Sequence, residues 1–197
     1  MAKNPTHKDT QKELLKQLFI SFCTGIRSAK AVKPKEWLEQ KELNYHDLQI
    51  GYNSSQFHHR QSKEFKEKYL ELGVLKPSDV SVKDKNLKAY TCFGGYGIIF
   101  PLKDEQGDII NLFAIHFETK TQREEYLNDE GIYPEYPNPL TKRLYICSSV
   151  VHTASLLQSK TLENRDAVIS LFNGTLKEQH IEAISKLNHL EEIIFIK

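Results

Sequence analysis

The stretch L-Y-I-C-S-S-V-V-H-T-A-S-L-L-Q, from Leu144 to Gln158, decides the fold class of this chain. It begins as an apolar strand and continues, after two serines, as a helix with apolar residues at helical spacing. Further strands are predicted at 167–171 and 192–196, with an N-G-T turn and a helix between them. Strands that alternate with helices form parallel sheets with right-handed crossovers. The fold class is therefore predicted to be α/β, with a βαβαβ unit over residues 141–197.

The bulk composition bounds the class of protein. The chain has 197 residues, enough for one large domain or two small ones. No apolar run approaches the roughly 20 residues needed to cross a bilayer, and the first residues lack the apolar part of a secretory signal. A cytoplasmic location without a membrane partner is therefore expected. The three cysteines, Cys23, Cys92 and Cys147, form no C-x-x-C pair, so neither a disulfide framework nor a cysteine-based zinc site is supported.

Charge is distributed unevenly along the chain. Residues 1–90 hold 17 Lys and Arg against 11 Asp and Glu, whereas residues 91–197 hold 10 against 15. A basic first half ahead of an acidic second half suggests two units, of which the first faces a polyanion. The alternative is that the Lys-rich helix faces are simply solvated, and the charge count alone leaves both interpretations open.

An N-terminal unit over residues 10–88 is expected to be basic and mainly helical, after a disordered lead over residues 1–9. Thr10 is expected to cap the first helix, whose apolar stripe runs to about Gly25. Two more helices are expected, one with Pro34 in its first turn and one over residues 62–72 that stops at Gly73.

Residues 89–140 are expected to contain an antiparallel hairpin and a long loop. The hairpin strands are predicted at 97–102 and 109–116, on either side of a D-E-Q-G turn. Residues 119–140 are polar and rich in Tyr and Pro, and they are predicted to be an irregular loop.

Six segments, taken in order, carry a resemblance to a known family over about residues 30–197. They are E-W-L-E-Q-K-E-L-N-Y-H-D-L-Q-I-G-Y, F-K-E-K-Y-L-E-L-G-V-L, G-I-I-F-P-L-K-D-E-Q-G-D-I, E-Y-L-N, T-K-R-L-Y and L-F-N-G-T-L-K-E-Q-H-I-E-A-I. Together they resemble the catalytic core of DnaG-type bacterial DNA primases, whose parallel sheet is a TOPRIM domain. The segments I-G-Y-N-S-S-Q-F-H-H-R and G-I-Y-P-E-Y-P look closest to primase-like proteins of mobile elements in the Bacteroides group. Relatives of that kind often carry a zinc finger upstream, which this sequence does not show.

The resemblance implies a metal site that the residues here do not supply. TOPRIM enzymes hold divalent metal with a Glu at the end of the first strand and a D-x-D pair after the third. Here Ser148 stands at the Glu position, Ser149 at the small residue after it, and His152 at the position of a helix Asp. The third strand ends at Lys197, where the D-x-D would begin. Because a neutral hydroxyl cannot replace a carboxylate toward Mg²⁺, and His prefers softer metals, we expect no metal and no cofactor in this chain. Mg²⁺ or Mn²⁺ is expected only if a longer parent is active.

The two serines also raise the question of nucleophilic catalysis. Ser148 or Ser149 at the start of a helix can reach His152. Such a pair also needs an orienting acid and an oxyanion hole, and no residue pattern here indicates either. Capping of the helix by the serines is the favoured interpretation, so no catalytic residue is predicted.

The resemblance also places a single-stranded template in a basic groove between the N-terminal unit and the TOPRIM unit. The residues expected to contact it are Lys142, Arg143, His58, His59, Arg60, Tyr126 and Asn128. An Arg can bind phosphate through two hydrogen bonds, and a Tyr can stack on a base for ~1–3 kcal/mol. The alternative is that the basic residues and histidines are ordinary solvated side chains.

The predicted function is a primase-like protein that binds single-stranded DNA in replication or in mobile-element maintenance, with a degenerate TOPRIM site. A replicative helicase or a mobile-element protein is a further expected partner. One alternative is a fragment of an active metal-dependent primase. Another is a protein-interaction module that uses the acidic second half and the loop at 126–139 as its surface.

Overall fold

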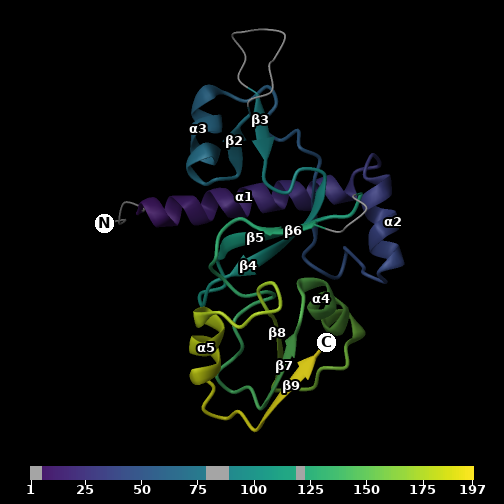
Figure 1. The fold of residues 1–197 in the computed structure, drawn as a ribbon, viewed down its shortest axis with the longest axis vertical. Helices are drawn as coiled ribbons and strands as arrows, with labels where there is room; N and C mark the ends of the chain where they lie inside the picture. Colours follow the sequence, from purple (N-terminus) through teal and green to yellow (C-terminus); the bar gives the residue numbers. More distant parts are fainter. Residues whose placement is uncertain (1–5, 79–88, 119–122) are drawn as a thin grey trace.

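The computed structural model describes residues 6–78, 89–118 and 123–197 of the chain (Figure 1). The helices are α1 (His7–Arg27), α2 (Val32–Gln40), α3 (Lys63–Glu71), α4 (Val150–Ser159) and α5 (Glu178–Ser185). The strands are β1 (Gly51–Asn53), β2 (Leu75–Pro77), β3 (Tyr90–Cys92), β4 (Gly97–Lys103), β5 (Ile109–His116), β6 (Arg123–Tyr126), β7 (Arg143–Cys147), β8 (Asp166–Ser170) and β9 (Glu192–Ile196). None of these helices is long and apolar enough to cross a membrane.

The last third of the chain forms the predicted parallel sheet, and the α/β fold class is confirmed. The strand order is β8-β7-β9, and both neighbours of β7 run parallel to it. Figure 1 shows α4 and α5 on two sides of these strands. Leu144 and Ile146 of β7 pack with Ala183 of α5 in one apolar cluster. Strand β7 leads into α4 through only Ser148 and Ser149, as the opening stretch predicts.

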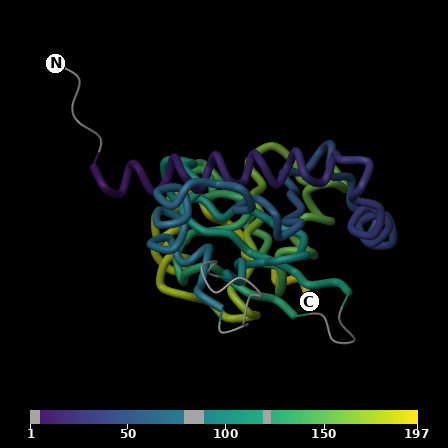
Figure 2. Tube along the Cα trace, turned by 90° about the horizontal axis from the view of Figure 1, so that it is seen from above, coloured from purple at the N-terminus to yellow at the C-terminus, as the bar shows by residue number. Residues whose placement is uncertain are grey.

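The middle of the chain forms a four-stranded antiparallel sheet in the order β1-β4-β5-β6. The predicted hairpin is its centre, with Phe100 opposite Phe113. Asp104 closes the turn, because its carboxylate accepts the N–H groups of Gln106 and Asp108 at 3.0 and 2.9 Å. Figure 1 and Figure 2 show α1 running across the width of the molecule beside this sheet. Lys12 of α1 holds the turn through an ion pair with Asp104 at 2.5 Å.

The prediction of an irregular loop over residues 119–140 is wrong for residues 123–126. Residues 123–126 form β6, which pairs antiparallel with β5. The four residues R-E-E-Y show only two partly buried side chains and no clear apolar alternation, so the pairing depends on the neighbouring strand rather than on local pattern.

The first helix begins and ends at residues other than those predicted. Thr6 caps it instead of Thr10, because the Thr6 hydroxyl accepts the Asp9 N–H at 3.2 Å and the Asp9 carboxylate accepts the Thr6 N–H at 2.9 Å. Residues 7–9 are therefore helical rather than part of a disordered lead. The helix continues through Gly25 to Arg27. A Cβ at Gly25 would lie 2.6 Å from the Tyr52 carbonyl, so this glycine allows β1 to approach the helix rather than ending it.

The third helix agrees with its prediction. Ser62 caps it by accepting the Phe65 N–H at 3.1 Å, and the chain leaves it through Gly73 at φ +73°. A short strand, β1, follows the second helix and pairs with β4, so the N-terminal part of the chain adds one strand to the sheet that contains the hairpin.

Apolar packing joins the antiparallel sheet to the elements on both of its faces. On one face, buried side chains of α1 pack in one cluster with Ile99, Leu112 and Ala114; they are Leu15, Leu18, Phe19 and Phe22. On the other face, Phe100 and Phe113 belong to a cluster that includes Val150 and Phe172 from the parallel unit. Each fully buried side chain of this size contributes roughly 1.5–3 kcal/mol. This packing fixes the junction between β7 and α4 relative to the antiparallel sheet.

Candidate functional site

The carboxyl edge of the parallel sheet, meaning Ser148, Ser149 and His152 at the β7–α4 junction, is the first candidate site. Ligands of open α/β sheets bind beyond the carboxyl ends of the strands, so a ligand of this sheet is expected at this edge. Ser149 is the helix cap, since its hydroxyl accepts the His152 N–H at 3.2 Å. The Ser148 N–H donates to the Ile196 carbonyl at 3.1 Å, which ties the junction to β9.

The Ser148 hydroxyl and the His152 imidazole are hydrogen-bonded at 3.1 Å through Nδ1. The contact allowed by the sequence spacing is therefore present. Among the described residues, no carboxylate hydrogen-bonds to His152, so the imidazole lacks an orienting acid. Burial raises the pKa of Glu124 and the charge of His152 works against that rise, so this carboxylate lies within electrostatic reach without closing a triad.

The donor set at this edge does not fit Mg²⁺. Mg²⁺ requires hard, mostly anionic oxygen ligands in a near-octahedral shell, whereas Ser148 and Ser149 offer neutral hydroxyls that are already hydrogen-bonded. Within residues 6–78, 89–118 and 123–197 no group of three or more His, Cys, Asp or Glu side chains is placed to hold a metal ion. Imidazole at His152 suits softer transition metals.

The amino edge of the same sheet, meaning Lys142 and Arg143 with their acidic partners, lies at the opposite end of β7. Arg143 binds Asp166 through two hydrogen bonds of 2.8 and 3.0 Å and pairs with Glu163 at 2.8 Å. Burial acts to raise the pKa of Asp166, but the Arg143 hydrogen bonds, the Glu163 N–H and the charge of Arg143 together hold that pKa below its usual value. Lys142 pairs with Glu191 at 2.5 Å. Both cations expected to line the groove are thus bound to carboxylates and lie away from the carboxyl edge.

The histidine cluster expected to bind phosphate divides into a buried and an exposed part. His58 is 6% exposed, and its Nδ1 lies 3.2 Å from the Cys92 thiol. Burial lowers the pKa of His58, so the ring stays neutral at pH 7. His59 and Arg60 are exposed beside it.

Tyr126 and Asn128 have structural contacts. The Tyr126 ring stacks on Phe172 with centroids 4.0 Å apart, and burial raises the pKa of its phenol to about 12. Asn128 donates to the Ile110 carbonyl at 2.9 Å and accepts the Glu130 N–H at 2.9 Å. Because one face of the Tyr126 ring is already covered, a base cannot stack there without displacing Phe172.

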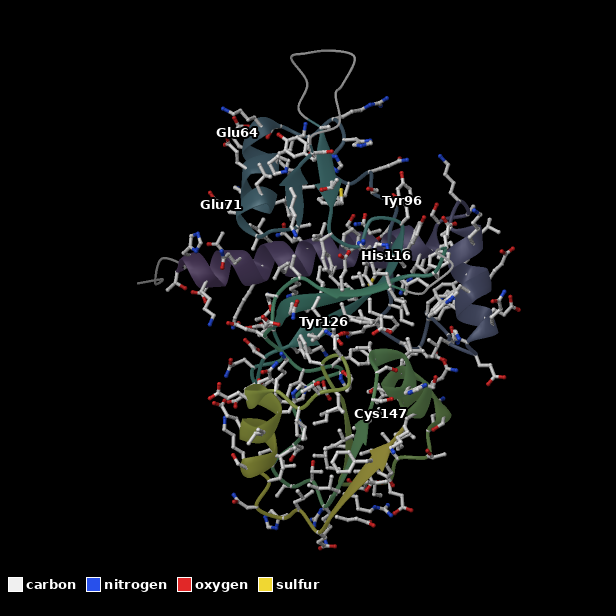
Figure 3. The ribbon with its side chains drawn as sticks, in the orientation of Figure 1. Glu64, Glu71, Tyr96, His116, Tyr126 and Cys147 are labelled. Carbon is white, nitrogen blue, oxygen red and sulfur yellow. The ribbon has the colours of Figure 1, made fainter. Side chains whose placement is uncertain are left out.

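The predicted contact residues belong to three different parts of the fold. Lys142 and Arg143 are at the amino edge of the parallel sheet, and His58 to Arg60 are beside β3. Tyr126 lies between the two sheets (Figure 3). Their contact with nucleic acid remains a prediction.

Sequence reasoning missed a surface next to the G-G-Y-G turn at 94–97. It carries an exposed Tyr96 and a network in which Glu125 accepts the Gly94 N–H at 2.6 Å and pairs with His116 at 2.9 Å. The signal in the sequence that could have indicated this surface was an aromatic residue, Tyr96, between glycines.

No protein-family model and no curated protein matches this chain. Several solved structures are similar to this chain. A DnaG primase catalytic domain bound to ssDNA superposes with a TM-score of 0.75 at 14% identity, covering 96% of this chain and 61% of that one. A DNA primase domain from Pseudomonas aeruginosa gives 0.73 at 14% identity, covering 94% and 60%. The RNA polymerase domain of Mycobacterium tuberculosis primase DnaG, in complex with double-stranded DNA, gives 0.69 at 8% identity, covering 95% and 63%.

These likenesses show that the chain has the fold of a DnaG primase catalytic domain over nearly its whole length. The chain spans only about 60% of the length of those domains. The link to mobile elements of the Bacteroides group stays a prediction.

Proposed function

We propose that this chain is a primase-like protein that binds single-stranded nucleic acid, and that its parallel unit is a TOPRIM domain without metal chemistry. The fold supports the first part, since structures of that fold are known with ssDNA and with double-stranded DNA. A role in DNA replication or mobile-element maintenance, beside a helicase or a mobile-element protein, belongs to the same proposal.

The single observation that supports the proposed lack of catalysis is the presence of Ser148 at the β7–α4 junction. Its hydroxyl is neutral and hydrogen-bonded to His152, so this position offers a dication no charged ligand. Two-metal phosphoryl transfer needs such ligands to position both ions. We therefore infer a scaffold that holds a strand and needs no Mg²⁺ or Mn²⁺ cofactor.

Fluorescence anisotropy with a labelled single-stranded oligonucleotide tests the proposal. We expect binding with a dissociation constant below about 100 μM at low salt, weakening steeply as salt rises. A primer-synthesis assay with Mg²⁺ or Mn²⁺ is expected to give no product. Absence of salt-sensitive binding would remove the proposal, and primer synthesis would remove its second half.

A fragment of an active primase is the second candidate, because the neighbouring domains are longer than this chain. It requires acidic ligands supplied by a longer parent, and Ser148 weighs against it. A longer parent that makes primers with Mg²⁺ would establish it.

A protein-interaction module is the third candidate, and the edge strand β9 favours it. Ile193 is 41% and Phe195 is 62% exposed on that strand, and exposed apolar edge strands pair readily with other chains. Purification of a bound protein without any DNA binding would support this function over the first.

A further inference from the structure

Tyr96 is held in a backbone conformation that its side chain does not favour. Its φ is +59°, between Gly94 at +57° and the start of β4, and 57% of the residue is exposed. A bulky L-residue at positive φ costs stability that glycine would not cost. Outliers of this kind are maintained where the surrounding structure enforces them, and they concentrate at functional sites.

The surroundings of the turn do enforce it. The Tyr96 N–H donates to the Asn53 carbonyl at 2.7 Å. Asn53 is 1% exposed, and its side-chain amide donates to the Phe93 carbonyl at 2.8 Å. On the other side of the turn, Glu125 accepts the Gly94 N–H. The ring therefore projects from a rigid base.

Internal packing does not account for the ring. Among the described residues, Tyr96 takes part in no ring–ring or cation–ring contact, whereas Tyr126 of the same sheet stacks on Phe172. Figure 3 shows Tyr96 well separated from Tyr126 and from Cys147 at the end of β7. Of the two tyrosines, Tyr96 is the one with an open face.

A second tyrosine, Tyr52, lies within electrostatic reach of Tyr96, and the cation Lys33 lies within reach of Tyr52. Burial raises the pKa of Tyr52, and the neighbouring Glu118 and Tyr96 raise it further. Lys33 pairs with Glu118 at 3.0 Å, and both side chains are exposed, at 73% and 45%. An exposed ion pair contributes little, so a phosphate can take the place of Glu118 at Lys33.

A groove of about 440 Å³ continues this surface past Tyr52. Residues that carry hydroxyl groups line it, namely Ser21 and Thr24 of α1 and Ser28 directly after that helix. Hydroxyls of this kind hydrogen-bond to phosphate and sugar oxygens without reading sequence. The exposed ring can stack on a base, the cation can bind a phosphate, and the hydroxyl groups of the groove can bind phosphate and sugar oxygens. Together they suit a single-stranded nucleic acid.

We propose that Tyr96 is a stacking platform for one base of a single strand, with Lys33 binding an adjacent phosphate. The inference rests on the proposed function and specifies where the strand lies. It places the strand on the antiparallel sheet beside α1 and α2 rather than at Lys142 and Arg143.

The variant Tyr96→Gly tests the platform without endangering the fold, because glycine accepts positive φ. Binding of a fluorescein-labelled oligothymidylate is expected to weaken about 5- to 100-fold, while the melting temperature stays equal or rises. Tyr96→Phe keeps the ring and is expected to bind within about twofold of wild type. Phe195→Ala removes an equally exposed ring from β9 and serves as the matched control, with binding unchanged.

A second measurement reads contact directly. An oligonucleotide carrying 5-iodouracil is expected to photocross-link to the peptide that contains Tyr96. If wild type binds but Tyr96→Gly binds equally well, or Phe195→Ala loses as much, the platform is refuted and the proposed function stands. If wild type binds no single strand, the proposed function fails together with the platform.

Discussion

The two ends of the parallel sheet are stabilised in opposite ways. At the carboxyl edge, hydrogen bonds between neutral groups stabilise the structure. Ser149 caps α4, and the buried His180 side chain is hydrogen-bonded to the Ser170 carbonyl at 3.0 Å. At the amino edge, Arg143 and Lys142 are bound to carboxylates. The ion pairs of the sheet thus stabilise the end where its strands begin, whereas neutral hydrogen bonds hold the end where ligands of this architecture bind.

The largest expected effect concerns the neutral edge. His180 is fully buried, accepts the Lys177 N–H at 3.0 Å and donates to Ser170, so His180→Ala leaves a cavity and unpaired groups. We expect a loss of ~2–4 kcal/mol in the free energy of unfolding, measured by urea denaturation. The control is His152→Ala at the exposed position of the same edge, expected within about 0.5 kcal/mol of wild type. Equal effects of the two variants would contradict the assignment of His180.

The charged edge is tested by replacing one cation at a time. Arg143→Met leaves Asp166, whose side chain is 2% exposed, without its ionic partner. We expect the melting temperature to fall by about 5 °C, since unpaired buried charge is costly. Lys142→Met, which removes an exposed pair next to it, is expected to shift the melting temperature by about 1 °C or less. A larger shift from Lys142→Met would show that the exposed pair dominates.

Acid is expected to weaken the two edges in different pH ranges. Burial lowers the pKa of His180 below its ordinary value of 6.5, so the contribution of the neutral ring is present above pH 6.5 and is lost as pH falls through the folded pKa. Asp166 has a pKa below its ordinary 3.8, so its contribution is lost only further down. When the free energy of unfolding is measured against pH, the first decline should be smaller in His180→Ala and the second decline should be smaller in Asp166→Asn. Unchanged profiles in both variants would contradict this separation.

The smallest expected effect comes from giving the carboxyl edge a charge. Ser148→Glu is expected to raise Mn²⁺ affinity about tenfold, because one carboxylate adds attraction but not a complete site. Ser155→Glu, on the exposed side of the same helix, is the matched control and is expected to change it less. Mn²⁺ binding followed by electron paramagnetic resonance measures both. A Ser148→Glu variant with unchanged affinity would show that geometry as well as charge has been lost.

Local signals in the sequence predicted much of this fold. The strand–serine–helix junction at 144–158, the hairpin at 97–116 and the helix between Ser62 and Gly73 all carry their own periodicity, caps or turns, and all are confirmed. Strands β1 and β6 were not predicted, because three or four residues without clear alternation become strands only through β4 and β5.

The candidate site was harder to predict from the sequence, because the contacts and exposure of its residues depend on partners that are distant in the chain. Arg143 becomes part of an ion pair through Asp166, which is 23 positions away. Tyr126 loses an open face to Phe172, and no local pattern announces that contact. The backbone of Tyr96 is held by a hydrogen bond to the Asn53 carbonyl, and Asn53 is also distant from it in the sequence.

One measurement tests most directly whether this protein holds a strand without a dication. Anisotropy isotherms for a single-stranded oligonucleotide are recorded in EDTA and in Mg²⁺ at matched ionic strength. We predict that the two curves superimpose, because Ser148, Ser149 and His152 offer Mg²⁺ no charged oxygen. Binding that appears only with Mg²⁺, or that tightens about tenfold or more, would contradict the account.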